Sequence, residues 1–301
     1  MTLTRAGFLS SAAAAMAVPP ARAQTGGRMQ QRRIPSSGAM LPVIGVGTWR
    51  TFDVGKRPEE RAPLAEVLRL LFEAGGSVID TSPMYGAAEG VVGDLLAGAG
   101  TRDTTFIATK VWTSGRAAGA EQMARSLQLL RTGHVELMQV HNLLDWRAHL
   151  PTLRAWKQEG RIRYLGVTHY TDSAHDELEA VLRAERWDFV QLNYAADDRA
   201  VERRLLPLAA ERGTAVIVNQ PFGGGGLLRR LSPRPLPAWA GEIGCTSWAQ
   251  LLLKFVLAHP AVTCVVPGTS KPDHLRDNVR AGSGPLPDAA QLRRLVAETA
   301  P

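Results

Sequence analysis

The sequence predicts an α/β fold, a TIM (β/α)8 barrel with an N-terminal β-hairpin and a C-terminal extra helix. Short β-rich runs alternate with longer amphipathic stretches at a repeat of roughly 25 to 30 residues, which is the length of a β/α unit. With the GVGTW strand included, the chain holds eight such units. Near-continuous apolar strands between helices indicate a parallel sheet buried on both faces, and eight units close most naturally into a barrel.

The individual elements follow in chain order. RRIPSSGAMLPVIGVGTWR reads as a hairpin of two short extended pieces joined by Ser-Ser-Gly, which supplies the turn, and the barrel is expected to begin near Val43. Later strands are expected at VIDTS (78–82), FIATK (106–110), ELMQVH (136–141), YLGVT (164–168), FVQLN (189–193), AVIVNQ (215–220) and TCVVPG (263–268). Stretches such as LAEVLRLLFEAG repeat apolar residues at three and four, as amphipathic helices do. The closing helix is expected over 287–300, outside the barrel.

Composition limits the partners of the chain. At 301 residues and 45% hydrophobic, one catalytic domain is expected, because such barrels form single domains. The net charge of +7 is spread over single arginines and pairs, which indicates a solvated surface rather than a nucleic-acid site. The longest apolar run is too short to insert into a membrane. Cys245 and Cys264 lack metal-type spacing, so buried free thiols and no metal site are expected.

Residues 1–23 have the organisation of an export signal. Arg5 precedes a small apolar run, and Ala21-Arg22-Ala23 matches a cleavage site before Gln24, which leaves 24–301 as the barrel domain. The stretch TRAGFL resembles a twin-arginine motif whose second arginine is replaced by Ala6. A functional leader predicts a periplasmic protein, exported folded by the twin-arginine route. The alternative is an uncleaved N-terminal tail on a cytoplasmic protein.

Four polar residues lie where barrel active sites form, at the carboxyl ends of strands. Asp80, Lys110 and His141 end three successive expected strands, and Tyr85 lies in the loop after the first of these. Taken singly, each has a simpler explanation: a turn-closing Asp, a solvated Lys or a core His. Buried together, an acid, a base and a phenol can pair with one another, and their joint placement favours a catalytic site.

Eight motifs resemble the aldo-keto reductase superfamily, in the family's order, between residues 34 and 278. They are IPSSGAMLPVIGVGTW, DTSPMYG with a following glutamate, TKVW, QVHNLLDW, IRYLGVT, VQLNY, QPFGGGGLL and VPGTSKPDHLRDN. The resemblance implies that Asp80, Tyr85, Lys110 and His141 are the catalytic tetrad. Tyr85 would donate the proton to a carbonyl that receives a hydride. A free phenol has a pKa of about 10, so Lys110 would lower it while Asp80 holds Lys110 charged.

The same resemblance implies a nicotinamide cofactor. Thr168, His169 and Gln191 would face the nicotinamide, although the family more often has Ser-Asn at the first two positions and frequently an aromatic residue where Asn219 stands. The glycines of QPFGGGGLL permit close backbone approach to a pyrophosphate. PGTSKPDHL places backbone N–H groups at a helix start, where a phosphate is favoured.

NADP is the expected cofactor, and NAD is the alternative. Lys271 and Ser270 suit a 2′-phosphate, but His274 replaces an arginine that many members use there, for which Lys271 and Arg276 would have to compensate. The full set expected at the cofactor is Gly47, Thr48, Asp80, Thr168, His169, Gln191, Pro221, Phe222, Gly223, Leu227, Gly268, Thr269, Ser270, Lys271, His274, Asp277 and Asn278. The set expected at the substrate is Trp49, Trp112 and His141.

The sequence therefore predicts an NADP-dependent oxidoreductase that reduces an aldehyde or ketone to the alcohol, with Tyr85 as general acid. The alternative is a nicotinamide-binding regulatory or scaffold subunit with little turnover, for which an intact tetrad is not required. The proline-rich segment 232–239 is expected to set specificity for a small carbonyl substrate. No heptad or long apolar edge in the sequence indicates an oligomeric state.

Overall fold

Eight parallel strands form the ring of the barrel in the computed structural model, which describes residues 28–299. The expected signal peptide and its cleavage site lie outside these residues. The strands are β3 (Val46–Gly47), β4 (Val78–Asp80), β5 (Phe106–Val111), β6 (Val135–His141), β7 (Ile162–Thr168), β8 (Phe189–Asn193), β9 (Ala215–Asn219) and β10 (Val262–Val265). They pair in chain order, and parallel bridges from Ile44 to Val265 and from Gly47 to Gly268 close the ring. The predicted fold class is thereby confirmed.

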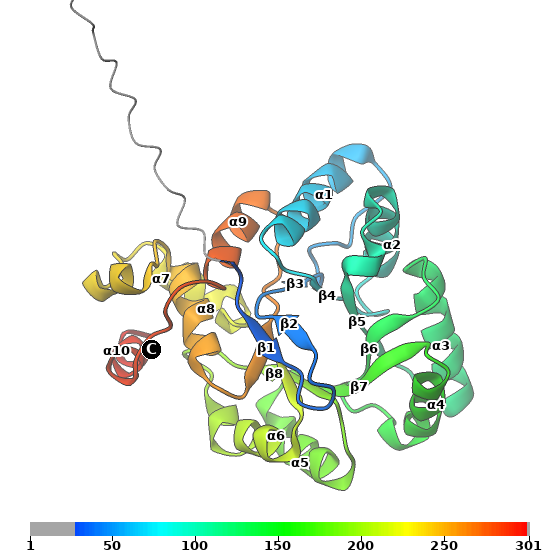
Figure 1. Cartoon of the computed structure of the whole chain (residues 1–301). Coiled ribbons are helices and arrows are strands. Elements are labelled where there is room, and N and C mark those ends of the chain that lie inside the picture. Colours follow the sequence, from blue (N-terminus) through cyan, green and yellow to red (C-terminus); the bar gives the residue numbers. More distant parts are fainter. Residues whose placement is uncertain (1–27, 300–301) are drawn as a thin grey trace, which may run out of the picture.

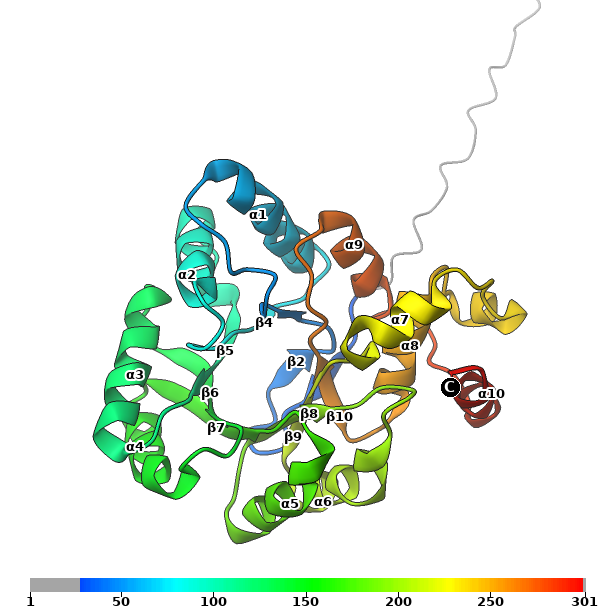
Figure 2. The same cartoon turned by 180° about the vertical axis from the view of Figure 1, so that it is seen from behind.

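Helices surround the strands on the outside (Figure 1 and Figure 2). Those that follow successive strands are α1 (Pro58–Glu73), α2 (Ala88–Ala99), α3 (Arg116–Leu129), α4 (Trp146–Gln158), α5 (His175–Ala184), α6 (Leu205–Arg212), α8 (Trp248–Ala258) and α9 (Pro272–Arg280). Short 3-10 turns occupy the connections at η1 (Arg102–Thr104), η2 (Asp172–Ala174), η3 (Ala200–Arg203), η4 (Gly223–Gly225) and η5 (Ala238–Ile243).

Burial explains why the two kinds of sequence pattern give these elements. Every residue of β5 is buried, as a strand covered by helices outside and by the barrel core inside requires. In α1 the buried residues recur at three and four along one face: Leu64, Val67, Leu68 and Leu71. Strands and helices therefore share one continuous apolar layer.

A hairpin closes the amino-terminal end of the barrel, where it crosses the barrel centre in Figure 1. β1 (Gln31–Arg33) pairs antiparallel with β2 (Met40–Pro42). Ile34 and Leu41 are buried with Phe106 and Phe189 in the interior apolar cluster. The Ser37 hydroxyl lies 2.8 Å from that of Tyr164 inside the barrel. The hairpin thus plugs this end and leaves the carboxyl ends of the strands as the open mouth.

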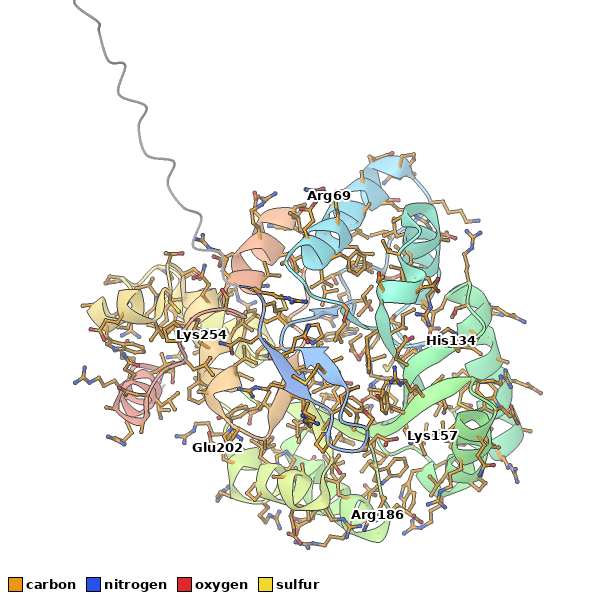
Figure 3. All side chains as sticks on the ribbon, viewed as in Figure 1. Arg69, His134, Lys157, Arg186, Glu202 and Lys254 are labelled. Carbon is orange, nitrogen blue, oxygen red and sulfur yellow. The ribbon has the colours of Figure 1, made fainter. Side chains whose placement is uncertain are left out.

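Three elements lie outside the regular repeat (Figure 2): α7 (Gly226–Leu231), η5 and α10 (Ala289–Thr299). The sequence predicted α10, but it did not predict α7 or η5. The buried Lys254 of α8 (Figure 3) donates hydrogen bonds of 2.7 Å to the carbonyls of both Ile243 and Pro285. It therefore ties the end of η5 and the approach to α10 to the barrel.

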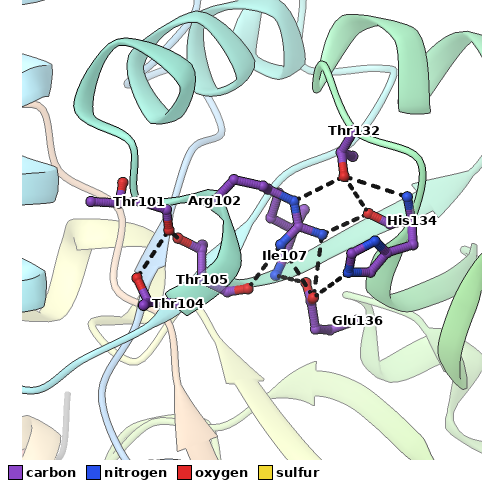
Figure 4. Close-up of polar contacts among 8 residues, drawn as sticks. All are labelled: Thr101, Arg102, Thr104, Thr105, Ile107, Thr132, His134 and Glu136. Carbon is purple, nitrogen blue, oxygen red and sulfur yellow. Dashed lines mark hydrogen bonds and ion pairs between the residues drawn. The ribbon is translucent and has the colours of Figure 1, made fainter.

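A polar network joins β5 to β6 at the plugged end (Figure 4). The Arg102 guanidinium lies 3.2 Å from Oε1 of Glu136 and donates to the His134 carbonyl at 2.6 Å. The other Glu136 oxygen accepts from the Ile107 N–H at 2.7 Å. Because this network lies opposite the mouth, its role is structural.

The remaining composition-based expectations concern thiols, metals and membranes. Cys245 and Cys264 are both buried and free, as expected. Residues 28–299 contain no group of three or more His, Cys, Asp or Glu side chains suited to a metal ion. Within the same residues, no helix has the length and apolarity that a membrane span needs.

Candidate active site

The carboxyl ends of β4, β5 and β6 bring Asp80, Lys110 and His141 together with Tyr85. The Lys110 ammonium lies 2.7 Å from Oδ1 of Asp80 and donates to the Thr81 carbonyl at 2.8 Å. It also lies 5.0 Å from the centroid of the Tyr85 ring. That ring meets the His141 imidazole edge to face, with centroids 5.9 Å apart. Residues up to 61 positions apart in the chain, Asp80 and His141, thus share one small volume.

Burial and charge act on these groups in opposite directions. Burial raises the pKa of Tyr85 above its usual value, while the Lys110 charge opposes that rise. Burial would by itself lower the pKa of Lys110, but Asp80 and Tyr85 hold it above its usual value. Lys110 therefore acts on the phenol in the expected direction, but the expected net lowering of the Tyr85 pKa is wrong, because burial outweighs the Lys110 charge. Lys110 remains an ammonium beside the phenol.

His141 is a neutral imidazole. Burial, assisted by the positive charge of Lys110 and by His169, lowers its pKa to about 2. Its Nδ1 lies 3.1 Å from the Ser82 hydroxyl, a buried contact that sequence reasoning missed. The signal was available, because Ser82 is a polar residue two positions after Asp80 at the same strand end.

A second buried residue, Glu89 of α2, is the glutamate that follows the DTSPMYG motif, and the sequence assigned it no role. It accepts hydrogen bonds from Thr109 at 2.6 Å and from Ser126 at 3.1 Å. Burial raises the pKa of its carboxyl group. Because Thr109 directly precedes Lys110, this contact braces the strand that carries the ammonium.

Apolar side chains surround the open mouth. Trp112 is 40% exposed and its ring centroid lies 6.4 Å from that of His141. Trp49 is 48% exposed and carries the Arg50 guanidinium 4.3 Å above its ring. Met84 and Tyr170 are exposed as well. An exposed apolar rim beside a polar centre is typical of a site for a small organic molecule.

The residues expected at the nicotinamide continue the same edge. Strand register places Thr168 beside His141 on one side and beside Gln191 on the other. Oε1 of Gln191 accepts from Gln139 at 3.3 Å. Oδ1 of Asn219, at the end of β9, is buried without a hydrogen-bond partner. The amide oxygen of Asn219 can therefore accept a hydrogen bond from a bound molecule, which fits the carboxamide of a nicotinamide.

His169 is held in a way that the sequence could not indicate. Its Nδ1 accepts from the Thr171 backbone N–H at 3.2 Å, and its ring stacks on Tyr170 with an interplanar angle of 7°. Since Nδ1 accepts, the neutral ring carries its proton on Nε2 and can only donate from there. An asparagine amide, by contrast, both donates and accepts.

A cavity of about 730 Å³ continues from the glycine loop to α9. Its lining includes Phe222, Gly225, Gly268, Thr269, His274, Asp277 and Asn278. Gly223, Gly224 and Gly225 all have positive φ, which glycine adopts without strain. Gly47 and Gly268 close the ring beside this cavity, and a Cβ at Gly47 would lie 2.9 Å from the Val266 carbonyl. Of the remaining residues of the expected set, Thr48, Pro221, Ser270 and Lys271 lie in the loops that follow β3, β9 and β10, and Leu227 lies in α7.

Two charged residues of this region make contacts that the sequence did not predict. Asp277 already accepts hydrogen bonds from Ser247 at 2.6 Å and Gln250 at 2.5 Å, so it braces the start of α8. Arg276 pairs with Asp273 and lies 3.8 Å from Glu66, and it is not among the residues that line the cavity with His274. The arginines that do line the cavity are Arg229 and Arg234, which sequence reasoning missed.

Comparisons with known proteins agree with this geometry. Residues 43–295 match the profile of the aldo/keto reductase family. The chain is 30% identical over 262 residues to the methylglyoxal reductase YeaE of Escherichia coli, covering 83% of this chain and 89% of that protein. The holo aldo-keto reductase AKR11C1 of Bacillus halodurans superimposes with a TM-score of 0.73 at 26% identity, covering 91% and 97% of the two chains. An aldo/keto reductase of Klebsiella pneumoniae in complex with NADP and acetate gives 0.74 at 27%, covering 87% and 92%.

Proposed function

Since the chain belongs to the aldo/keto reductase family and is an oxidoreductase, we propose that it reduces an aldehyde or ketone to the alcohol with Tyr85 as general acid. The observation that carries the proposal is the buried Asp80–Lys110 pair beside the Tyr85 ring and the His141 imidazole. A pure binding role makes no use of an ammonium beside a phenol, so this arrangement favours turnover over a scaffold function.

A nicotinamide held by Thr168, His169 and Gln191 would supply the hydride that the carbonyl carbon receives. As negative charge develops on the carbonyl oxygen, the Tyr85 hydroxyl transfers its proton there. Lys110 stabilises the phenolate that remains, and Asp80 keeps Lys110 protonated and fixed in place. His141 donates a hydrogen bond to the same oxygen and orients the substrate. The buried surroundings of Lys110 and His141 exclude water from these charges.

The cofactor is proposed to be NADP. Its adenosine portion would lie in the cavity of about 730 Å³, where Arg229 and Arg234 supply positive charge opposite the start of α9. Lys271 is the N-cap residue of α9, and its side chain forms no ion pair within residues 28–299. The cofactor named in the Klebsiella pneumoniae complex supports the choice of NADP over NAD. The apolar rim around His141, together with the activity named for YeaE, supports a small carbonyl compound as substrate.

The proposal is tested by NADPH oxidation with methylglyoxal and with 4-nitrobenzaldehyde, comparing the wild type with Tyr85→Phe. We expect kcat/KM to fall by about 100-fold or more, because general acid catalysis contributes that much. The affinity for NADPH, measured by fluorescence titration, is expected to change by less than about threefold. Equal turnover in the two proteins would remove the catalytic assignment of Tyr85.

We also propose, on separate grounds, that residues 1–23 direct export to the periplasm with the cofactor already bound. The motif TRAGFL and the Ala21-Arg22-Ala23 site support this proposal. N-terminal sequencing of the protein from fractionated cells is expected to begin at Gln24 in the periplasm. A Met1 start confined to the cytosol would contradict it.

A further inference from the structure

Ser82 is the one hydrogen-bond partner of the His141 ring among residues 28–299. Its hydroxyl lies 3.1 Å from Nδ1, and both residues are buried. The same Ser82 oxygen accepts from the Met84 backbone N–H at 3.4 Å. The other ring nitrogen, Nε2, has no partner within the described chain.

The neutral state of His141 makes this contact important. A neutral imidazole has one N–H, and the nitrogen without a hydrogen can only accept. If the proton were on Nδ1, Nε2 would be an acceptor and would repel a carbonyl oxygen. If the proton is on Nε2, Nδ1 needs a donor, and a serine hydroxyl can rotate to provide one.

The other groups facing the ring do not fix its tautomer. The Lys110 ammonium is held by Asp80 and the Thr81 carbonyl. Tyr85 and Trp112 face His141 with their rings, at 5.9 Å and 6.4 Å between centroids. His169 influences the imidazole only through charge, and its own Nδ1 is bonded to the Thr171 N–H.

The Met84 N–H donates to the Ser82 oxygen, which acts there as an acceptor. The Ser82 O–H therefore remains available to donate to Nδ1 of His141. We propose that Ser82 is a positioning residue that holds His141 in the Nε2–H tautomer, so that Nε2 donates to the substrate carbonyl oxygen. The effect of this tautomer on turnover rests on the function proposed above, whereas the tautomer itself does not depend on that function.

One short segment then orients two members of the tetrad. Asp80 and the Thr81 carbonyl fix the Lys110 ammonium, and Ser82 fixes the His141 ring. The turn after β4 keeps these groups in place, because the Ser82 carbonyl accepts from the Tyr85 N–H at 3.0 Å. Tyr85 therefore enters the site from the same turn.

The tautomer is measured by long-range ¹⁵N–¹H NMR of histidine-labelled protein saturated with NADP, with His141→Gln used to assign the signal. We expect a protonated Nε2 and an accepting Nδ1 in the wild type. In Ser82→Ala we expect both nitrogens to shift towards averaged values, because Nδ1 loses its donor. A wild-type ring protonated on Nδ1, or a spectrum unchanged in Ser82→Ala, would overturn the proposal.

Turnover provides the second readout. In Ser82→Ala we expect kcat to fall by about tenfold, because one orienting hydrogen bond is lost. The NADPH dissociation constant is expected to stay within about twofold of the wild-type value. Ser82→Thr keeps a hydroxyl and is expected to restore the tautomer and most of kcat. Ser37→Ala, which removes the part-buried hydroxyl contact with Tyr164 at the plugged end, is the control and is expected to leave both readouts unchanged. Tenfold-lower kcat in Ser82→Ala without rescue by Thr would contradict the role of the hydroxyl.

The two proposals fail in different ways. If the wild type shows the expected tautomer but no carbonyl compound is reduced by any variant, the function is wrong and the positioning role of Ser82 stands. If carbonyl reduction depends on Tyr85 but not on Ser82, the function stands and the positioning role is wrong.

Discussion

The Lys110 ammonium lies 2.7 Å from the Asp80 carboxylate, and the two side chains are only 1% and 6% exposed. A buried ammonium of this kind depends on its counter-charge, because water cannot replace the lost carboxylate. The pair therefore affects both the stability of the barrel and the chemistry of Tyr85.

Asp80→Asn keeps the shape of the side chain and removes its charge. We expect the free energy of unfolding at pH 7 to fall by about 3 kcal/mol, since one buried charge is left unpaired. Urea denaturation followed by circular dichroism measures this change. The double variant Asp80→Asn/Lys110→Met is expected to lose less stability than Asp80→Asn alone. A larger loss in the double variant would show that Lys110 does not need the carboxylate.

His141 makes stability depend on pH. Its pKa is lowered to about 2 in the folded protein, whereas an unfolded histidine titrates near 6.5. The unfolded chain therefore binds a proton first as the pH falls, so the stability from neutral His141 is complete above about pH 6.5 and is lost below it. As the pH falls from 7 to 5, the titration of His141 alone is expected to lower the free energy of unfolding by about 2 kcal/mol.

The matching variant is His141→Gln, which has no titratable ring. Its free energy of unfolding is expected to change by about 2 kcal/mol less between pH 7 and pH 5 than that of the wild type. Urea titrations at the two pH values provide the comparison. Equal changes in both proteins would show that His141 does not titrate below its usual range.

His169→Asn restores an amide that both donates and accepts at a position proposed to face the nicotinamide. We expect the NADPH dissociation constant to fall by about three- to tenfold, which corresponds to one added hydrogen bond. Fluorescence titration measures it, and His169→Ala, which can neither donate nor accept, is the control expected to weaken binding. Tighter binding in His169→Ala would indicate that the ring merely obstructs the cofactor.

Arg102→Met removes the guanidinium that links Glu136 to the His134 carbonyl at the plugged end of the barrel. The residue is mostly buried, so we expect a loss of about 2 kcal/mol in the free energy of unfolding. Because the network lies at the end opposite the mouth, kcat and the NADPH affinity are expected to stay unchanged. A fall in kcat at full folding would contradict the division of the barrel into a structural and a catalytic end.

Strand positions were largely predictable from sequence, and the differences have local causes. The expected strand 189–193 coincides with β8, in which the first four residues are buried. The expected strand 78–82 ends two residues early, since the chain turns at Ser82 to bond the Tyr85 N–H. The expected strand 263–268 stops at Val265, ahead of Pro267, which has no N–H to pair.

α7 and η5 were not predictable, because their stability comes from distant partners. Leu231 and Trp239 are buried in the main apolar cluster. The Arg234 side chain donates to the Glu298 carbonyl in α10 at 3.1 Å. The backbone carbonyl of Arg234 accepts from the Trp248 indole N–H at 2.9 Å. Nothing in a proline-rich stretch indicates these contacts beforehand.

The amino-acid sequence by itself determined the repeat of apolar strands and amphipathic helices, and with it the edge at which Asp80, Lys110 and His141 had to meet. In a ring of parallel strands, all carboxyl ends lie at the same edge. The positions of these residues at the ends of successive strands were therefore sufficient to predict that they meet. The tertiary structure decided what each side chain touches there: the Ser82 hydroxyl on His141, the Thr171 N–H on His169, and the donors that occupy Asp277. Those contacts depend on ångström-scale positions, which are set by the packing of the whole barrel and carry no signal in the spacing of residues along the chain.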